Sequence, residues 1–121
     1  MENRIHIKIT ETEEFRKEAN YYLKKRRLCF EDINDLRRIL AANPELGDLI
    51  PKTGGIRKIR LKSIGTGTRG GFRVCYYYLV GSEIFLIAIF HKTEQENLSN
   101  DEIVALKNIS SAIKKRERSH E

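Results

Sequence analysis

Seven lysine and arginine side chains are gathered in residues 49–82, a stretch that contains no aspartate or glutamate. They are Lys52, Arg57, Lys58, Arg60, Lys62, Arg69 and Arg73. The whole chain carries 23 basic and 17 acidic side chains, a formal net charge of +6, so the rest of it is close to neutral. Cations held close together repel each other, and proteins tolerate this mostly where an anion binds. The stretch predicts a site for a polyanion, with a solvated basic edge strand as the alternative.

The cations of this stretch can be placed relative to one another from the period of a β-strand. Lys58, Arg60 and Lys62 alternate with other residues, as in a half-buried strand, so the three share one face. Arg73 begins the next expected strand, where it can lie beside the first two of them. Lys92 follows the last expected strand and can approach the same rim. We therefore expect cations from three adjacent strands to converge on one surface.

No other catalytic constellation accompanies these cations in the sequence. There is no carboxylate pair, Ser-His-Asp arrangement or cluster of metal ligands, so we expect neither a metal ion nor another cofactor. Cys29 and Cys75 are too few and too far apart for a disulfide framework or a zinc site. His91, where the last expected strand ends, is a candidate for proton transfer because histidine titrates near neutral pH, although a lone histidine is more often structural.

A glycine-rich run at residues 65–70 matches the pattern G-x-G-x-x-G. The dinucleotide-binding fingerprint requires a helix after this pattern, so that the helix N-terminus can hold a pyrophosphate. Here a strand is expected next, and the fingerprint does not apply. Arg69 within the run favours a flap over a phosphate chain, and a mobile hairpin tip is the alternative.

The elements that must position these side chains follow the order β-α-α-β-β-β-α in one domain. They are a strand over residues 4–9, helices over 10–26 and 30–43, strands over 56–62, 72–80 and 84–90, and a helix after Ser99. Capping boxes are expected at Thr10 with Glu13 and at Ser99 with Glu102. The apolar positions at helical spacing are Phe15, Ala19, Tyr22 and Leu23, then Phe30, Ile33, Leu36 and Leu40. The expected fold class is α+β, with a twisted, mainly antiparallel sheet flanked by helices.

The composition restricts where such a chain acts. No apolar run approaches the roughly 20 residues that a membrane-spanning helix needs. The first residues are charged and show no secretory signal. We expect a cytoplasmic protein without a membrane partner.

Several motifs in the same order resemble the RelE/ParE toxin superfamily. Two segments resemble the core of that superfamily: Arg57-Lys58-Ile59-Arg60-Leu61 and Gly71-Phe72-Arg73-Val74-Cys75-Tyr76. Three segments resemble its HigB branch: residues 43–51, Gly54-Gly55-Ile56-Arg57-Lys58 and residues 91–98. The resemblance extends over about residues 5–113, and the family's element order agrees with the one expected above.

The resemblance implies a toxin of a type II toxin–antitoxin system that cuts mRNA in the A site of the 70S ribosome, beside ribosomal RNA, without a metal ion. It implies a HigA-like helix-turn-helix antitoxin as partner and a toxin that alone is a monomer. By their positions in the motifs, it assigns catalysis to Lys58, Arg60, Arg73 and Lys92, with His91 as a further candidate. RNA binding is expected at Arg57, Lys62 and Arg69. Some relatives have a catalytic tyrosine where this chain has Leu98, so proton transfer would rely on cations or His91.

Two other functions fit the same sequence. A ParE-like gyrase poison predicts DNA damage with intact mRNA, whereas a nuclease predicts cuts in register with codons. A noncatalytic RNA-binding module predicts affinity that falls steeply with salt and no cleavage product.

Overall fold

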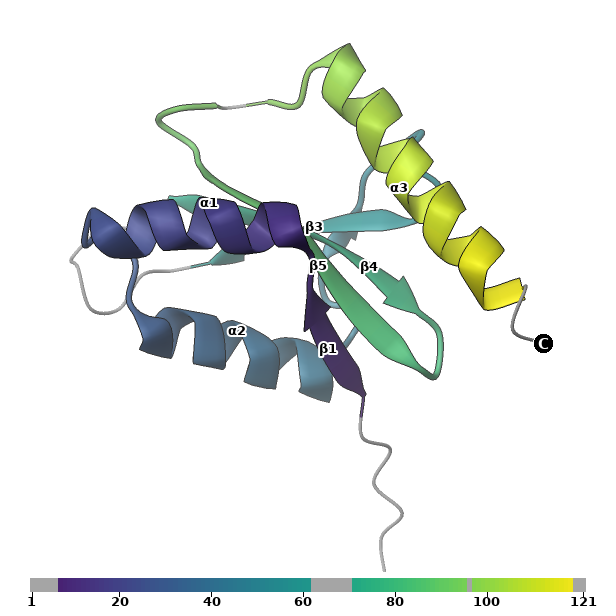
Figure 1. The fold of residues 1–121 in the computed structure, drawn as a ribbon, viewed down its shortest axis with the longest axis horizontal. Helices are drawn as coiled ribbons and strands as arrows, with labels where there is room; N and C mark the ends of the chain where they lie inside the picture. Colours follow the sequence, from purple (N-terminus) through teal and green to yellow (C-terminus); the bar gives the residue numbers. More distant parts are fainter. Residues whose placement is uncertain (1–6, 62–70, 96, 119–121) are drawn as a thin grey trace, which may run out of the picture.

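The computed structural model describes residues 7–61, 71–95 and 97–118 of the 121-residue chain. In chain order its elements are β1 (Lys8–Glu11), α1 (Glu13–Lys24), α2 (Phe30–Ala42), β2 (Asp48–Leu49), β3 (Ile56–Leu61), β4 (Phe72–Leu79), β5 (Glu83–His91) and α3 (Asn100–Arg118). The expected α+β class and element order are confirmed (Figure 1). The short strand β2 is an addition that the sequence did not predict.

The five strands form one mixed sheet in the order β1-β5-β4-β3-β2. β1 pairs with β5 in parallel, and β5, β4, β3 and β2 pair with their neighbours in antiparallel fashion. The expected meander of β3, β4 and β5 is therefore confirmed. A register shift between Cys75 and Tyr76 interrupts the pairing of β4 with β5.

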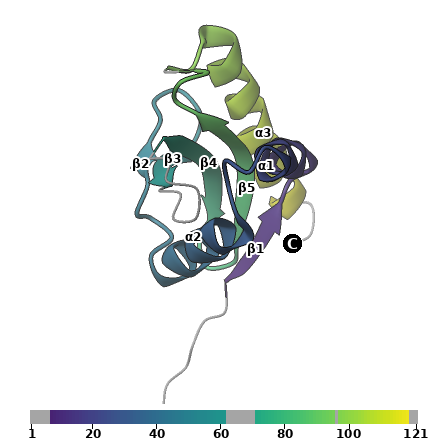
Figure 2. The same ribbon diagram turned by 90° about the vertical axis from the view of Figure 1, so that its left-hand side faces the viewer.

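Helices cover both faces of this sheet (Figure 2). α1 and α2 pack on one face, where Phe15, Leu36 and Leu40 are fully buried or nearly so. α3 packs on the other face through Leu106, against a cluster that includes Cys75. Because β4 is buried on both sides, its tyrosines are packing residues: the exposed fraction is 0% for Tyr76 and 7% for Tyr77.

Two details of the helices differ from the sequence prediction. Thr12, not Thr10, caps α1, and its hydroxyl accepts a hydrogen bond from the Phe15 N–H at 3.2 Å. Thr10 instead belongs to β1, where its hydroxyl donates to Glu83 of the paired strand. Phe30 was expected to pack in the core, but 72% of its surface is exposed. It is the first residue of α2 and precedes Asp32, the first buried residue of that helix. The residues expected to begin the first strand, 4–6, lie outside the described part of the chain.

The capping box at the start of α3 is confirmed, since the Ser99 hydroxyl accepts the Glu102 N–H and the Glu102 carboxylate accepts the Ser99 N–H. Further along, buried Ser110 donates to the Thr53 carbonyl at 2.7 Å. Lys114 donates to the Gly54 carbonyl, also at 2.7 Å. These bonds fix α3 to the loop that leads into β3. No helix in the described ranges is long and apolar enough to cross a membrane.

Candidate nucleic-acid interface

The centre of the cationic surface is a pair of arginines on adjacent antiparallel strands. Arg60 of β3 and Arg73 of β4 are direct register partners. Lys58 lies two residues before Arg60, so the strand period places it on the same face of the sheet, opposite Cys75. Burial raises the pKa of the Cys75 thiol to about 12, against the opposing effect of the nearby Lys58 ammonium. The structure thus places Lys58, Arg60 and Arg73 on one face, as the strand period and the expected pairing of the next strand predicted.

Lys92 joins this surface from the end of β5. Its backbone N–H donates to the Gly71 carbonyl at 2.7 Å, which ties the residue after β5 to the residue that precedes β4. Arg73 follows Gly71 by two residues, and the register of the sheet pairs it with Phe90. Lys92 is exposed, so its ammonium is accessible at the rim.

His91 is buried, with 4% of its surface exposed. Its ring packs edge-on against Phe72, with the ring centroids 4.9 Å apart. Its Nδ1 lies 2.6 Å from the Thr93 hydroxyl oxygen and accepts the Thr93 N–H at 3.2 Å. Its Nε2 is buried without a hydrogen-bond partner among the described residues and faces Gly71, where an added Cβ would lie only 2.2 Å away.

Burial and the surrounding cations together disfavour the protonated form of His91. Burial lowers the pKa of the imidazole, because it disfavours the charged form, and the charges of Arg27, Lys92 and Arg73 lower that pKa further. Glu94 opposes them. His91 is therefore neutral at neutral pH.

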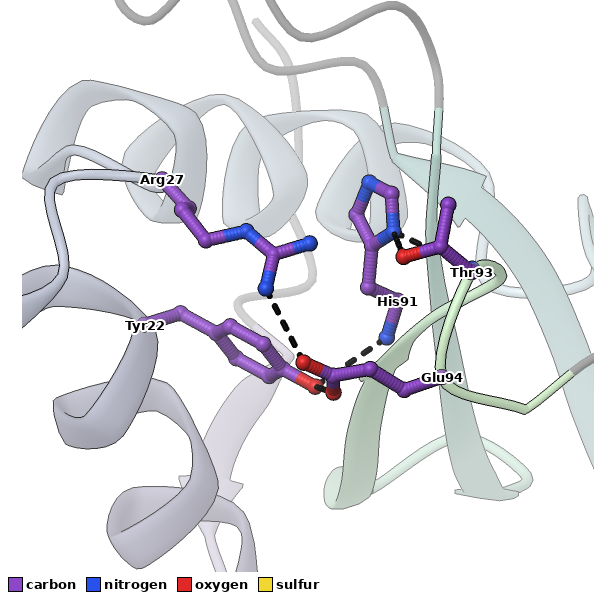
Figure 3. A network of polar contacts seen from close by, with 5 residues as sticks. All are labelled: Tyr22, Arg27, His91, Thr93 and Glu94. Atoms are coloured by element: carbon purple, nitrogen blue, oxygen red, sulfur yellow. Dashed lines mark hydrogen bonds and ion pairs between the residues drawn. The ribbon is translucent and has the colours of Figure 1, made fainter.

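A polar network holds the turn that carries Lys92 (Figure 3). The Glu94 carboxylate accepts hydrogen bonds from the Tyr22 hydroxyl at 2.5 Å and from the Arg27 guanidinium at 2.9 Å. The Tyr22 oxygen in turn accepts the His91 N–H at 3.2 Å. Burial and the Glu94 carboxylate raise the pKa of Tyr22 to about 12. The hydrogen bond from the Tyr22 hydroxyl is the largest cause that holds the pKa of Glu94 below its usual value, and the Arg27 guanidinium lowers it further.

Arg27 is a residue of this region that the sequence did not single out. It comes from the connection between α1 and α2 and meets Glu94 across 67 positions of the chain. Its guanidinium also lies over the Tyr22 ring, 5.6 Å from the centroid. Strand periodicity and charge clustering describe only residues close in sequence. They could therefore not have predicted this contact between distant residues.

The remaining expected RNA-binding residues are placed differently. Arg57 points to the face opposite Lys58 and Arg60, and its guanidinium donates to the carbonyls of Glu45 at 2.9 Å and Gly47 at 2.6 Å. The structure therefore does not bring Arg57 to the cationic surface. Lys62 and Arg69 lie outside the described residues. Leu98, where some relatives have a tyrosine, packs with the apolar cluster under α3.

The arrangement can bind and stabilise a phosphate group. Arg60 and Arg73 offer planar donors that fit phosphate oxygens, and Lys58 and Lys92 add point charges. In the described part of the chain, no group of three or more His, Cys, Asp or Glu side chains could hold a metal ion.

A comparison with protein-family models bears on this site. The model described as "RelE toxin of RelE / RelB toxin-antitoxin system" matches residues 7–120, nearly the whole chain. The match includes all five strands, the cationic surface from Lys58 to Lys92 and the network around Glu94. The chain belongs to the RelE toxin family and is the toxin component of a toxin–antitoxin system.

Proposed function

We propose that this toxin is an endoribonuclease that cuts mRNA in the ribosomal A site and thereby stops translation in the cytoplasm. The observation that carries the proposal is the placement of Arg60 directly opposite Arg73, with Lys58 on the same face and Lys92 at the adjoining rim. The proposed reaction is attack of a ribose 2′-hydroxyl on the neighbouring phosphate, which yields a cyclic phosphate and a free 5′-hydroxyl.

Arg73 is the proposed phosphate clamp. Negative charge builds on the phosphoryl oxygens as the 2′-oxygen attacks, so fixed cations stabilise the transition state more than the ground state. A guanidinium can bind two phosphate oxygens at once, and Arg60 on the facing strand can share the developing charge. Side-chain cations thus take the part that a metal ion plays in other nucleases.

Proton transfer is assigned to the lysines. Arginine stays protonated and is a poor base, whereas a lysine in its neutral amine form can take up a proton, so the amine form of Lys58 is proposed to accept the proton of the 2′-hydroxyl and become an ammonium. Lys92 or His91 would protonate the leaving 5′-oxygen. Lys92 is exposed while His91 is buried beneath Gly71, so we assign this step to Lys92 and give His91 the role of holding the turn.

The remaining parts of the proposal concern partners. Lys62 and Arg69, on the segment between β3 and β4, are proposed to extend the RNA contact. The ribosome supplies the substrate geometry, a contribution that can amount to several kcal/mol. A HigA-like helix-turn-helix antitoxin neutralises the toxin, which alone is a monomer.

Primer extension on translated and untranslated mRNA tests the proposal. The wild-type toxin should produce cuts in register with codons only when the message is translated. Arg73→Ala should lose them, whereas Arg38→Ala, which removes an exposed arginine from α2, should keep them. Intact mRNA together with DNA damage would contradict the nuclease and favour a gyrase poison. Retention of all cuts by Arg73→Ala would contradict the clamp.

A further inference from the structure

A recess, here called the groove, lies on the face of the sheet that α3 covers. It has a volume of about 530 Å³ and is bounded by the first half of α1, by α3 and by strands β4 and β5. Its floor is apolar, with Cys75, Ile87 and Phe90 from the strands. Leu106 and Ile109 of α3 form an apolar wall. The volume is within the range of roughly 300–1,000 Å³ that ligand-binding clefts occupy.

The charge of this groove is opposite to that of the rest of the protein. Four glutamates line it, Glu13, Glu14, Glu18 and Glu102, and none of its described lining residues is lysine or arginine. This is unusual in a chain with 23 basic side chains. Glu13 forms an ion pair with Lys17 on the same helix, at 3.6 Å.

Three of these carboxylates lie close enough to interact. Glu18 is half-buried and accepts the Ile89 N–H at 3.0 Å. Burial raises the pKa of Glu18, and the charges of Glu14 and Glu102 raise it further. Carboxylates from α1 and α3 therefore line the same recess, above an apolar floor. A ligand that brings positive charge between them would relieve their repulsion.

We propose that this groove binds a segment of the antitoxin in which apolar side chains are flanked by lysine or arginine. An apolar floor between a helix and a sheet accepts the apolar face of an amphipathic segment, and the acidic rim selects basic flanks. RNA is a poor occupant because its phosphates would be repelled by the rim. The inference deepens the antitoxin pairing given above and does not depend on RNA cleavage.

The position of the groove suggests how such a segment neutralises the toxin. Phe90 lines the groove and is the register partner of Arg73. Cys75 lines its floor and is the register partner of Lys58. A bound segment would therefore lie beside the cationic surface, where it blocks the approach of a ribosome-bound message.

The binding step can be tested without RNA or ribosomes. The probe is a short fluorescent synthetic peptide with leucine at i, i+3, i+4 and i+7 and lysine between, compared with the same peptide carrying glutamate for lysine. Ala105→Arg, at an exposed lining position, and Glu14→Lys should each weaken binding of the lysine peptide by at least about tenfold. Glu31→Lys, the same charge change on α2, should bind as the wild type does. Equal binding of both peptides, or no difference among the variants, would overturn the proposal.

A second arm tests the occupant in the natural complex. A photo-crosslinking amino acid in place of Ala105 should join the toxin to its antitoxin when the two are produced together. Crosslinks to a second toxin chain alone, or none, would overturn the assignment to the antitoxin. Absence of mRNA cleavage by the toxin without its antitoxin, together with crosslinking in the complex, would contradict the nuclease and leave the groove assignment standing.

Discussion

Arg60 and Arg73 face each other directly across the antiparallel pair of β3 and β4. Side chains in such positions have Cβ atoms about 4.5–5.5 Å apart, and like charges there are destabilising. One Arg73 nitrogen also donates to the Phe72 carbonyl at 3.3 Å, which helps hold the guanidinium near the strand. A chain that keeps two arginines in these positions accepts a cost in folding free energy, which an anion bound between them would offset.

Replacing Arg73 should therefore separate activity from stability. Arg73→Ala is expected to lower the rate of mRNA cleavage by about 10²–10³-fold, as loss of one transition-state donor does. The free energy of unfolding should change by no more than about 1 kcal/mol, since a like-charge contact is removed as well. Cleavage of a translated message and urea denaturation give the two quantities.

Arg57→Ala is the contrast for stability on the same pair of strands. Its guanidinium donates to two carbonyl groups, so the substitution should cost about 1–3 kcal/mol of unfolding free energy. An Arg73→Ala protein less stable than Arg57→Ala would show that Arg73 is mainly structural.

The cationic surface could be predicted from sequence because its rules are local. Strand alternation placed Lys58 with Arg60, and the expected pairing of β3 with β4 placed Arg73 beside them. The same alternation puts Arg57 on the other face, where its guanidinium donates to carbonyl groups of the connector before β3. A charge count over the stretch could not separate these two uses of arginine.

Contacts between distant segments were beyond the reach of the same rules. The bonds of Glu94 with Tyr22 and Arg27 depend on how the end of α1 meets the turn after β5. The predicted start of the first helix was wrong by two residues, since Thr12 and not Thr10 caps α1. Pairing of β1 with β5 keeps Thr10 extended and leaves Thr12 to cap α1.

The hydrogen bonds of Glu94 should make stability depend on pH in the acidic range. The pKa of Glu94 is lowered in the folded protein, so its contribution is fully present above its usual value of about 4.5 and is lost as pH falls through the folded value. Glu94→Gln removes this contribution, and its stability deficit should therefore shrink as pH falls below about 4.5. Tyr22→Phe, which removes the largest cause of the shift, should reduce the pH dependence in the same direction. Urea midpoints between about pH 6 and pH 3 measure it, and a deficit that stays constant would contradict the linkage.

Two glycines with positive φ provide a matched pair for the attachment of α3. Gly54 has φ +74° and an added Cβ would lie 2.6 Å from the Ser110 hydroxyl oxygen, whereas Gly81 has φ +78° and nothing within 4 Å. Gly81→Ala should cost only the backbone strain, about 1–2 kcal/mol. Gly54→Ala should cost about 1–3 kcal/mol more, because it also pushes α3 from its anchor. Thermal or urea unfolding compares the two, and equal losses would show that Ser110 yields without cost.

Gly71 should be replaceable only together with His91. A Cβ at position 71 would lie 2.2 Å from Nε2 and 2.7 Å from Cε1 of the His91 ring, so the whole ring must move. Gly71→Ala is expected to cost about 1–3 kcal/mol of unfolding free energy. It should also slow cleavage, because the displaced ring disturbs the bond from the Lys92 N–H to the Gly71 carbonyl. In a double-mutant cycle with His91→Ala the clash is absent, so the two losses should fall short of additivity by about 0.5–3 kcal/mol. Additive losses would mean that Gly71 and His91 do not contact each other as described.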